Sequence, residues 1–226
     1  RGTDIGWEFP FTAARALTSL LEKRFVVKDD LAEWLNLSQA PLPTLPAHCE
    51  LIANADLYSE LNDGRTPFPH QRAGARWLLA RRGALLADEM GLGKTLTVLL
   101  AARAMVRLVN VHVLVVAPLG LHAHWLKEAS ALDIDIDLYG WGSLPKNLPV
   151  SETLLVVDEA HFAQSLNSKR TQALLRLARH PSLMAIWMIT GTPMKNGRPI
   201  EHFPLLAAIK HPLAEDKRAF EQYFCE

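Results

Sequence analysis

The sequence predicts an α/β fold, in which a mostly parallel β-sheet is covered by helices on both faces. From residue 67 onward, short apolar runs typical of buried strands alternate with segments of helical periodicity. Such alternation builds a parallel sheet, because each helix carries the chain back across it. The expected strands are 83–87, 111–117, 134–138, 153–157 and 184–189. The expected helices are 70–82, 94–109, 120–131 and 168–180, with another near 199–210.

The first part of the chain has a different character. Residues 11–24 have helical periodicity, and a second short helix is expected after an N-cap at Asp29 or Asp30. The stretch 40–46 contains three prolines and predicts a linker. The predicted organisation is an accessory segment of unknown role at 1–60 and a main domain at 61–226.

Composition narrows the class of protein. The 226 residues are 49% hydrophobic and 21% charged, which is typical of a globular protein with a sizeable core. Basic and acidic residues both number 24, so any nucleic-acid surface must be a local patch. The two cysteines form no metal spacing, there is no signal-peptide pattern, and no apolar stretch approaches the ~20 residues of a membrane span. We therefore expect an intracellular protein without a membrane partner, and a piece of a longer chain.

The segment Asp88-Glu89-Met90-Gly91-Leu92-Gly93-Lys94-Thr95 directly follows the first expected strand. A glycine-bearing loop that opens a helix directs backbone N–H groups at one small volume, which suits a polyphosphate. Lys94 would reach the β- and γ-phosphates, and the Thr95 hydroxyl would bind Mg²⁺. The generic phosphate-loop pattern requires glycine at position 88, so this segment alone leaves a plain strand–turn–helix open.

Two acidic residues, Asp158 and Glu159, follow the apolar run 154–157. Ligands of parallel sheets bind beyond the carboxyl ends of the strands, so we expect these acids at the same edge as the glycine loop. Asp158 would hold Mg²⁺ through water, and Glu159 would polarise the attacking water. Alone, two acids after a strand favour an exposed turn or a helix N-terminus; together with the loop they favour a nucleotide site.

Three further segments complete the pattern. The turn Thr190-Gly191-Thr192-Pro193 follows the last expected strand, and its alternative is a simple polar turn. Pro118-Leu119-Gly120 opens a helix after another strand, where backbone N–H groups can hold a nucleic-acid phosphate. Trp125 in that helix is expected in the core. The amide of Gln71 can pair with an adenine edge.

In this order and spacing, the five elements resemble the SNF2 family of helicase superfamily two, from about residue 66 onward. The resemblance implies the first lobe of an ATP-driven motor on duplex DNA, with a P-loop NTPase, RecA-like three-layer fold, a small N-terminal extension, and ATP and Mg²⁺ as cofactors. Asp158-Glu159-Ala160-His161 corresponds to its DEAH box, and the tail from Thr192 is similar to the annealing-helicase branch. The implied catalytic residues are Lys94, Asp158 and Glu159. The implied nucleotide ligands are Gln71, Asp88, Gly91, Leu92, Gly93, Lys94 and Thr95, with Thr95 and Asp158 at the metal. The implied DNA-contact or coupling residues are Pro118, Leu119, Gly120, His161, Thr190, Gly191, Thr192, Lys195 and Asn196.

Two departures from the family pattern limit the expected activity. The family's later motifs belong to a second RecA-like lobe that these residues lack, and its arginine fingers contribute ~10³–10⁵ in rate. We therefore expect the chain to bind ATP weakly and to hydrolyse it slowly or not at all. Ala163-Gln164-Ser165 replaces a lysine–asparagine pair of many relatives, so a secondary contact there is not expected.

Three alternatives remain open from the sequence. The lobe could belong to an RNA helicase, although the Met-Gly-Leu-Gly loop and Thr-Gly-Thr-Pro favour the DNA motor. It could be a P-loop ATPase unrelated to nucleic acid, which the interval from Pro118 to Trp125 disfavours. It could also be a non-catalytic module in which 1–60 recruits a partner and the lobe only senses nucleotide. DNA contacts, in the favoured case, should be made mainly to phosphates, independent of sequence and weakened by salt.

Overall fold

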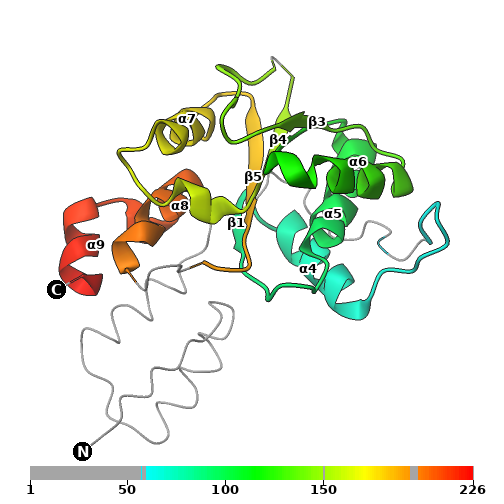
Figure 1. The fold of residues 1–226 in the computed structure, drawn as a ribbon, viewed down its shortest axis with the longest axis horizontal. Coiled ribbons are helices and arrows are strands. Elements are labelled where there is room, and N and C mark those ends of the chain that lie inside the picture. The colour runs from blue at the N-terminus through cyan, green and yellow to red at the C-terminus, as the bar shows by residue number, and fades with distance from the viewer. Residues whose placement is uncertain (1–56, 58–59, 150, 194–197, 226) are drawn as a thin grey trace, which may run out of the picture. The chain divides into compact units, whose positions relative to one another are not determined.

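The computed structural model describes residue 57 and residues 60–149, 151–193 and 198–225. The expected helices before residue 40, the linker and almost all of the predicted accessory segment lie outside the described residues, as do Lys195 and Asn196. Within the described residues, the α/β prediction is confirmed (Figure 1).

The sheet has five strands, and every neighbouring pair is parallel. Their order across the sheet is β1-β5-β4-β2-β3. The strands are β1 (Gly83–Leu86), β2 (His112–Val116), β3 (Asp137–Tyr139), β4 (Thr153–Asp158) and β5 (Leu183–Ile189).

The strand expected at 134–138 begins only at Asp137. The preceding residues are still turning out of a helix: Asp133 has a left-handed backbone (φ 55°), and the Ile134 N–H donates to the Ala129 carbonyl. The apolar side chain of Ile134 packs in the core beside that helix and is not part of the sheet. The predicted strand therefore begins too early in the sequence.

Helices cover both faces of the sheet (Figure 1). Residues of one face pack with α4 (Pro69–Leu79), α5 (Lys94–Val109) and α6 (His122–Ala131). Residues of the other face pack with α7 (Lys169–Leu177) and α8 (Phe203–Ala208), and α9 (Lys217–Phe224) follows. Each face of the sheet has its own hydrophobic core. Successive side chains of β4 point to opposite faces, so Leu154 and Val156 pack in the core with α4, α5 and α6, and Leu155 and Val157 pack in the core with α7 and α8. The expected helix at 120–131 begins with a 3₁₀ turn at Leu119–Leu121. The expected helix near 199–210 likewise begins with a 3₁₀ turn, at Pro199–His202.

The carboxyl ends of three adjacent strands lie level with one another. Leu86 at the end of β1 and Asp158 at the end of β4 are both in register with Ile189 at the end of β5. Since neighbouring strands lie ~4.8 Å apart, the loops that leave these strands start side by side. We call this place the carboxyl edge. Within the part of the chain that the structure describes, no helix combines the length and apolar character that a membrane crossing needs.

Candidate nucleotide-binding site

The loop after β1 depends on two glycines. Gly91 and Gly93 have left-handed backbones, with φ of 86° and 73°, and Gly93 is the N-cap of α5. At Gly91 a Cβ would meet no atom within 4 Å, so only its backbone angle requires glycine there. A Cβ at Gly93 would overlap the Gln71 amide. The sequence pattern therefore corresponds to a real conformational requirement at both positions.

Lys94 lies over this loop. Its Nζ donates to the carbonyl oxygens of Asp88 and Glu89, at 2.8 Å each. The loop residues from Asp88 to Gly93 are all exposed, and Thr95 is half-buried in the first turn of α5. The ammonium is thus held by two carbonyl groups of exposed residues, so it can leave them for another acceptor while water solvates the carbonyls.

Asp158 is a buried acid at the carboxyl edge, with 7% of its surface exposed. Its Oδ2 accepts a hydrogen bond from the indole N–H of Trp125, and its Oδ1 accepts one from the backbone N–H of Glu159, both at 2.8 Å. Burial raises the pKa of Asp158, while these two hydrogen bonds oppose that rise. The charge of Glu159 raises this pKa further, and the charge of Lys94 lowers it.

Glu159 and His161 connect this acid to the loop after β5. Glu159 has a left-handed backbone (φ 49°), an unusual conformation for a residue with a side chain. Its Oε2 lies 3.0 Å from Nδ1 of His161. The same ring nitrogen lies 3.1 Å from Oγ1 of Thr190 and 3.3 Å from Oγ1 of Thr192. The segments that follow β4 and β5 are therefore joined through one imidazole.

The loop after β5 also approaches the glycine loop after β1. A Cβ at Gly191 would lie 2.6 Å from Cγ of Met90 and 3.6 Å from Nζ of Lys94. A side chain at position 191 would therefore have to displace the exposed Met90 side chain, whereas the Gly191 backbone angle itself does not require glycine. The loops after β1 and β5 therefore meet at the carboxyl edge, where β4 also ends at Asp158.

Gln71 in α4 borders the same loop. Its Oε1 accepts from the Phe68 N–H at 3.0 Å, and its Nε2 donates to the Leu92 carbonyl at 3.5 Å. His70 Nε2 lies 3.0 Å from the same carbonyl. The sequence did not indicate this capping role. An amide has a second N–H and a second lone pair, so pairing with an adenine edge stays a prediction.

Some of the candidate DNA contacts follow β2, further along the carboxyl edge. Pro118, Leu119 and Gly120 follow β2, two strands away from β5; Leu119 is 75% exposed, and a Cβ at Gly120 would meet no atom within 4 Å. Thr192 is exposed, whereas Thr190 is buried and serves the hydrogen bonds described above. The structure thus leaves the segment after β2 open to a large ligand.

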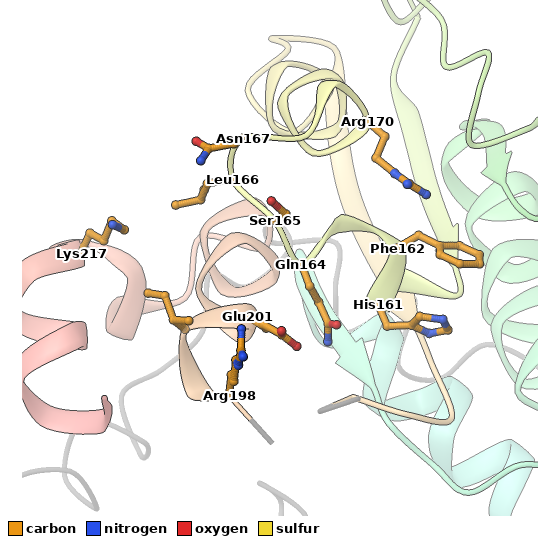
Figure 2. Close-up of a pocket in the computed structure, with 11 residues that line it drawn as sticks. His161, Phe162, Gln164, Ser165, Leu166, Asn167, Arg170, Arg198, Glu201 and Lys217 are labelled. Carbon is orange, nitrogen blue, oxygen red and sulfur yellow. The ribbon is translucent and has the colours of Figure 1, made fainter. Parts of the chain in front are cut away.

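A cavity of about 520 Å³ lies beside this site rather than within it (Figure 2). His161, Phe162 and Gln164 line one side, with Arg170 above them. Arg198, Ile200, Glu201 and Lys217 line the other side. Lys94, Thr95 and Asp158 do not line it, and the loop residues Asp88 to Gly93 are exposed.

The residues at the carboxyl edge fit a magnesium ion bound with a nucleotide. Hydroxyl and carboxylate oxygens, from Thr95 and Asp158, are the ligand types that Mg²⁺ prefers. Among the described residues no group of three or more His, Cys, Asp and Glu side chains forms a metal cage. Phosphate oxygens and water would have to supply the remaining ligands, which is the usual arrangement at nucleotide sites.

Sequence reasoning missed the role of two tryptophans. Trp125 is fully buried, as expected, but it also donates to the Asp158 carboxylate from 33 positions upstream. The Trp141 indole donates to the backbone carbonyl of Asp158 at 3.0 Å. No local pattern carries either contact, because both depend on which strands are neighbours.

A family model described as the SNF2-related domain matches residues 70–133 and 147–226. A bovine (Bos taurus) protein, SWI/SNF-related matrix-associated actin-dependent regulator of chromatin subfamily A-like protein 1, is 28% identical over 221 residues, covering 86% of this chain and 22% of the relative. The rice (Oryza sativa subsp. japonica) SNF2 domain-containing protein ENL1 is 47% identical over 73 residues, covering 30% of this chain and 7% of the relative. This chain spans about a fifth of the length of the first relatives.

The fold is similar to solved helicase-like structures. The Sulfolobus solfataricus SWI2/SNF2 ATPase core in complex with dsDNA has a TM-score of 0.60 and 22% identity, covering 74% of this chain and 41% of that one. The UvsW helicase from bacteriophage T4 has a TM-score of 0.51 and 14% identity, covering 87% of this chain and 76% of that one. At these identities the likeness establishes the fold, a RecA-like lobe with a mostly parallel sheet.

Proposed function

Because the chain belongs to the SNF2-related domain family, we propose that it is the ATP-binding lobe of a DNA-dependent ATPase that moves along duplex DNA. The observation that supports this most strongly is the convergence at the carboxyl edge. Lys94 at the start of α5, Asp158 at the end of β4 and Gly191 after β5 are remote in sequence. Nevertheless, a Cβ at Gly191 would lie 3.6 Å from the Lys94 ammonium, and Asp158 is level with Ile189, two residues before Gly191. A plain strand–turn–helix would not require this arrangement.

The proposed roles follow from the chemistry of each group. The N–H groups of the glycine loop and the Lys94 ammonium bind the β- and γ-phosphates, and Gln71 contacts the adenine. Thr95 and Asp158 hold Mg²⁺, which neutralises charge on the phosphates. Glu159 positions the attacking water, and the contacts of His161 with Glu159, Thr190 and Thr192 link it to the segment after β5.

Duplex DNA is the proposed polymer. The Sulfolobus SWI2/SNF2 ATPase core, which has a similar fold, was solved in complex with dsDNA. In this lobe, Leu119 and Gly120 after β2 are exposed. Backbone N–H groups at the start of a helix suit phosphates, so binding should be independent of base sequence. Thr192, Lys195 and Asn196 are the further proposed contacts.

Hydrolysis in this proposal requires a second RecA-like lobe. The phosphate loop is exposed, so another surface has to cover the nucleotide and supply the arginine that stabilises transition-state charge. The lobe by itself should therefore bind MgATP and turn it over slowly or not at all.

Titration of the 226-residue chain with a fluorescent ATP analogue, with Mg²⁺ and with EDTA, tests the nucleotide site. We expect binding that Mg²⁺ strengthens and that Lys94→Ala weakens. Nucleotide binding that ignores both changes would contradict the proposal.

The choice of polymer needs a separate titration of duplex DNA against duplex RNA of equal length, at two salt concentrations. We expect preferential DNA binding that falls as salt is raised. Preferential binding of RNA would favour the RNA-helicase alternative.

A further inference from the structure

The Asp158 carboxylate is oriented from outside its own strand. Trp125 is fully buried in α6, and its indole N–H donates to Oδ2 of Asp158 at 2.8 Å. An indole can only donate and an ionised carboxylate can only accept, so the polarity of this bond is fixed. The Glu159 N–H occupies the other oxygen. Two donors on opposite oxygens prevent the carboxylate from rotating.

The helix that carries this indole is itself held in place. Glu128, one turn further along α6, accepts from both terminal nitrogens of Arg65, at 3.2 and 3.0 Å. Its side chain is 8% exposed, and Arg65 also pairs with Asp63. A paired, largely buried carboxylate at this position resists displacement of α6.

Hydrogen-bond partners outside the ligand sphere commonly orient the groups that bind a metal, and their loss lowers metal affinity by ~10–100-fold. We propose that Trp125 is a positioning residue for the metal site, because it holds the Asp158 carboxylate in the orientation that binds the Mg²⁺ of MgATP. This inference rests on the proposed function, since it takes Asp158 as the metal-binding acid. The other surfaces of Trp125 pack in the core, so its loss also affects stability.

A second tryptophan allows the two roles of Trp125 to be separated. Trp187 in β5 is equally buried, and its indole N–H donates to the Arg81 backbone carbonyl at 3.0 Å. Both side chains combine core packing with one hydrogen bond, but only Trp125 donates to the acid at the carboxyl edge. Trp187→Phe is therefore the matched control for Trp125→Phe.

The experiment compares the affinity of the 226-residue chain for a fluorescent ATP analogue in Mg²⁺ and in EDTA. For Trp125→Phe we expect the gain in affinity from Mg²⁺ to fall by about tenfold or more, while the affinity in EDTA changes by less than about twofold. Trp187→Phe should keep the wild-type gain, although both variants unfold at lower denaturant concentration. An unchanged gain in Trp125→Phe overturns the proposal.

A double-mutant cycle tests whether Trp125 acts through Asp158. In the background of Asp158→Asn, Trp125→Phe should have no further effect on the gain from Mg²⁺. An equal and additive loss in that background overturns the proposal, because Trp125 would then act by another route.

Two other results have defined meanings. If Trp125→Phe does not fold, benzothienylalanine at position 125 keeps the shape and replaces the indole N–H by sulfur, and the same loss of the Mg²⁺ gain is expected. A wild-type chain whose nucleotide affinity ignores Mg²⁺ overturns the proposed metal site, and this inference with it. A wild-type gain that survives in the position-125 variants overturns this inference alone.

Discussion

The two halves of the candidate site, the glycine loop after β1 and the Asp158 carboxylate, are held by opposite means. The loop is exposed, and its shape comes from glycines within eight consecutive residues, with Lys94 bonded to carbonyls of the same loop. Asp158 is buried, and its carboxylate is fixed by an indole that is 33 positions away in sequence. The first half is therefore a local structure, and the second exists only when α6 and β4 are packed together. Substitutions should consequently affect the two halves in different ways.

The largest effect is expected for Lys94→Ala. Hydrogen bonds to charged groups contribute about 1.5–3 kcal/mol, so the affinity for the nucleotide should fall by about 10–150-fold, with Mg²⁺ and without it. The free energy of unfolding should change little, since the lysine bonds only to exposed loop carbonyls. Fluorescent-nucleotide titration measures the first quantity and urea unfolding the second. Lys127→Ala, at an exposed position of α6, is the control, and an equal loss there would contradict the assignment.

Asp158→Asn should weaken nucleotide binding only when Mg²⁺ is present. We expect the affinity in Mg²⁺ to fall by about tenfold, because an amide is a poorer Mg²⁺ ligand than a carboxylate. In EDTA the affinity should stay the same or rise, since a negative charge near the phosphates has been removed. This response has the opposite sign to that of Lys94→Ala in EDTA. Equal losses under both conditions would mean that Asp158 supports the loop rather than the metal.

The same contrast explains what the sequence could predict. The phosphate loop and α5 are encoded by neighbouring residues, and α5 begins at Lys94 and ends at Val109, as the periodicity predicted. Asp158 is level with the end of β5 because the two strands pair in parallel, so their shared edge was also predictable. The start of β3 could not be predicted, because the pattern of apolar residues does not reveal the left-handed turn at Asp133.

The contacts that fix the acid could not be predicted from the chain alone. Trp125 reads as a core residue, and the structure confirms that it is buried. Its hydrogen bond to Asp158 depends on β2 lying next to β4, which the strand order decides. Likewise, the Gln71 side chain caps its own helix by accepting a hydrogen bond from the Phe68 N–H. The identity of residue 71 alone does not predict this contact.

Gly93→Ala tests how far the loop depends on its own backbone, with Gly64→Ala as the control. Both glycines have left-handed backbones, with φ of 73° and 81°, so alanine should cost about 1 kcal/mol at either position. At Gly64 the nearest atom to the added carbon is 3.5 Å away, whereas at Gly93 it would overlap the Gln71 amide. We therefore expect Gly93→Ala to lower the unfolding free energy by about 2 kcal/mol and to weaken nucleotide binding, while Gly64→Ala leaves binding unchanged. Equal unfolding free energies for the two variants would show that Gln71 does not constrain the loop.

Trp141→Phe should have the smallest effect, and it separates the Asp158 backbone from its carboxylate. The Trp141 indole donates to the Asp158 carbonyl at 3.0 Å, so its loss should lower the unfolding free energy by about 1 kcal/mol in urea unfolding. The backbone there is already fixed by the pairing of Asp158 with Ile189 in β5. The gain in nucleotide affinity from Mg²⁺ should therefore stay within about twofold of wild type. A loss as large as that expected for Trp125→Phe would mean that the end of β4, and not the carboxylate orientation, limits metal binding.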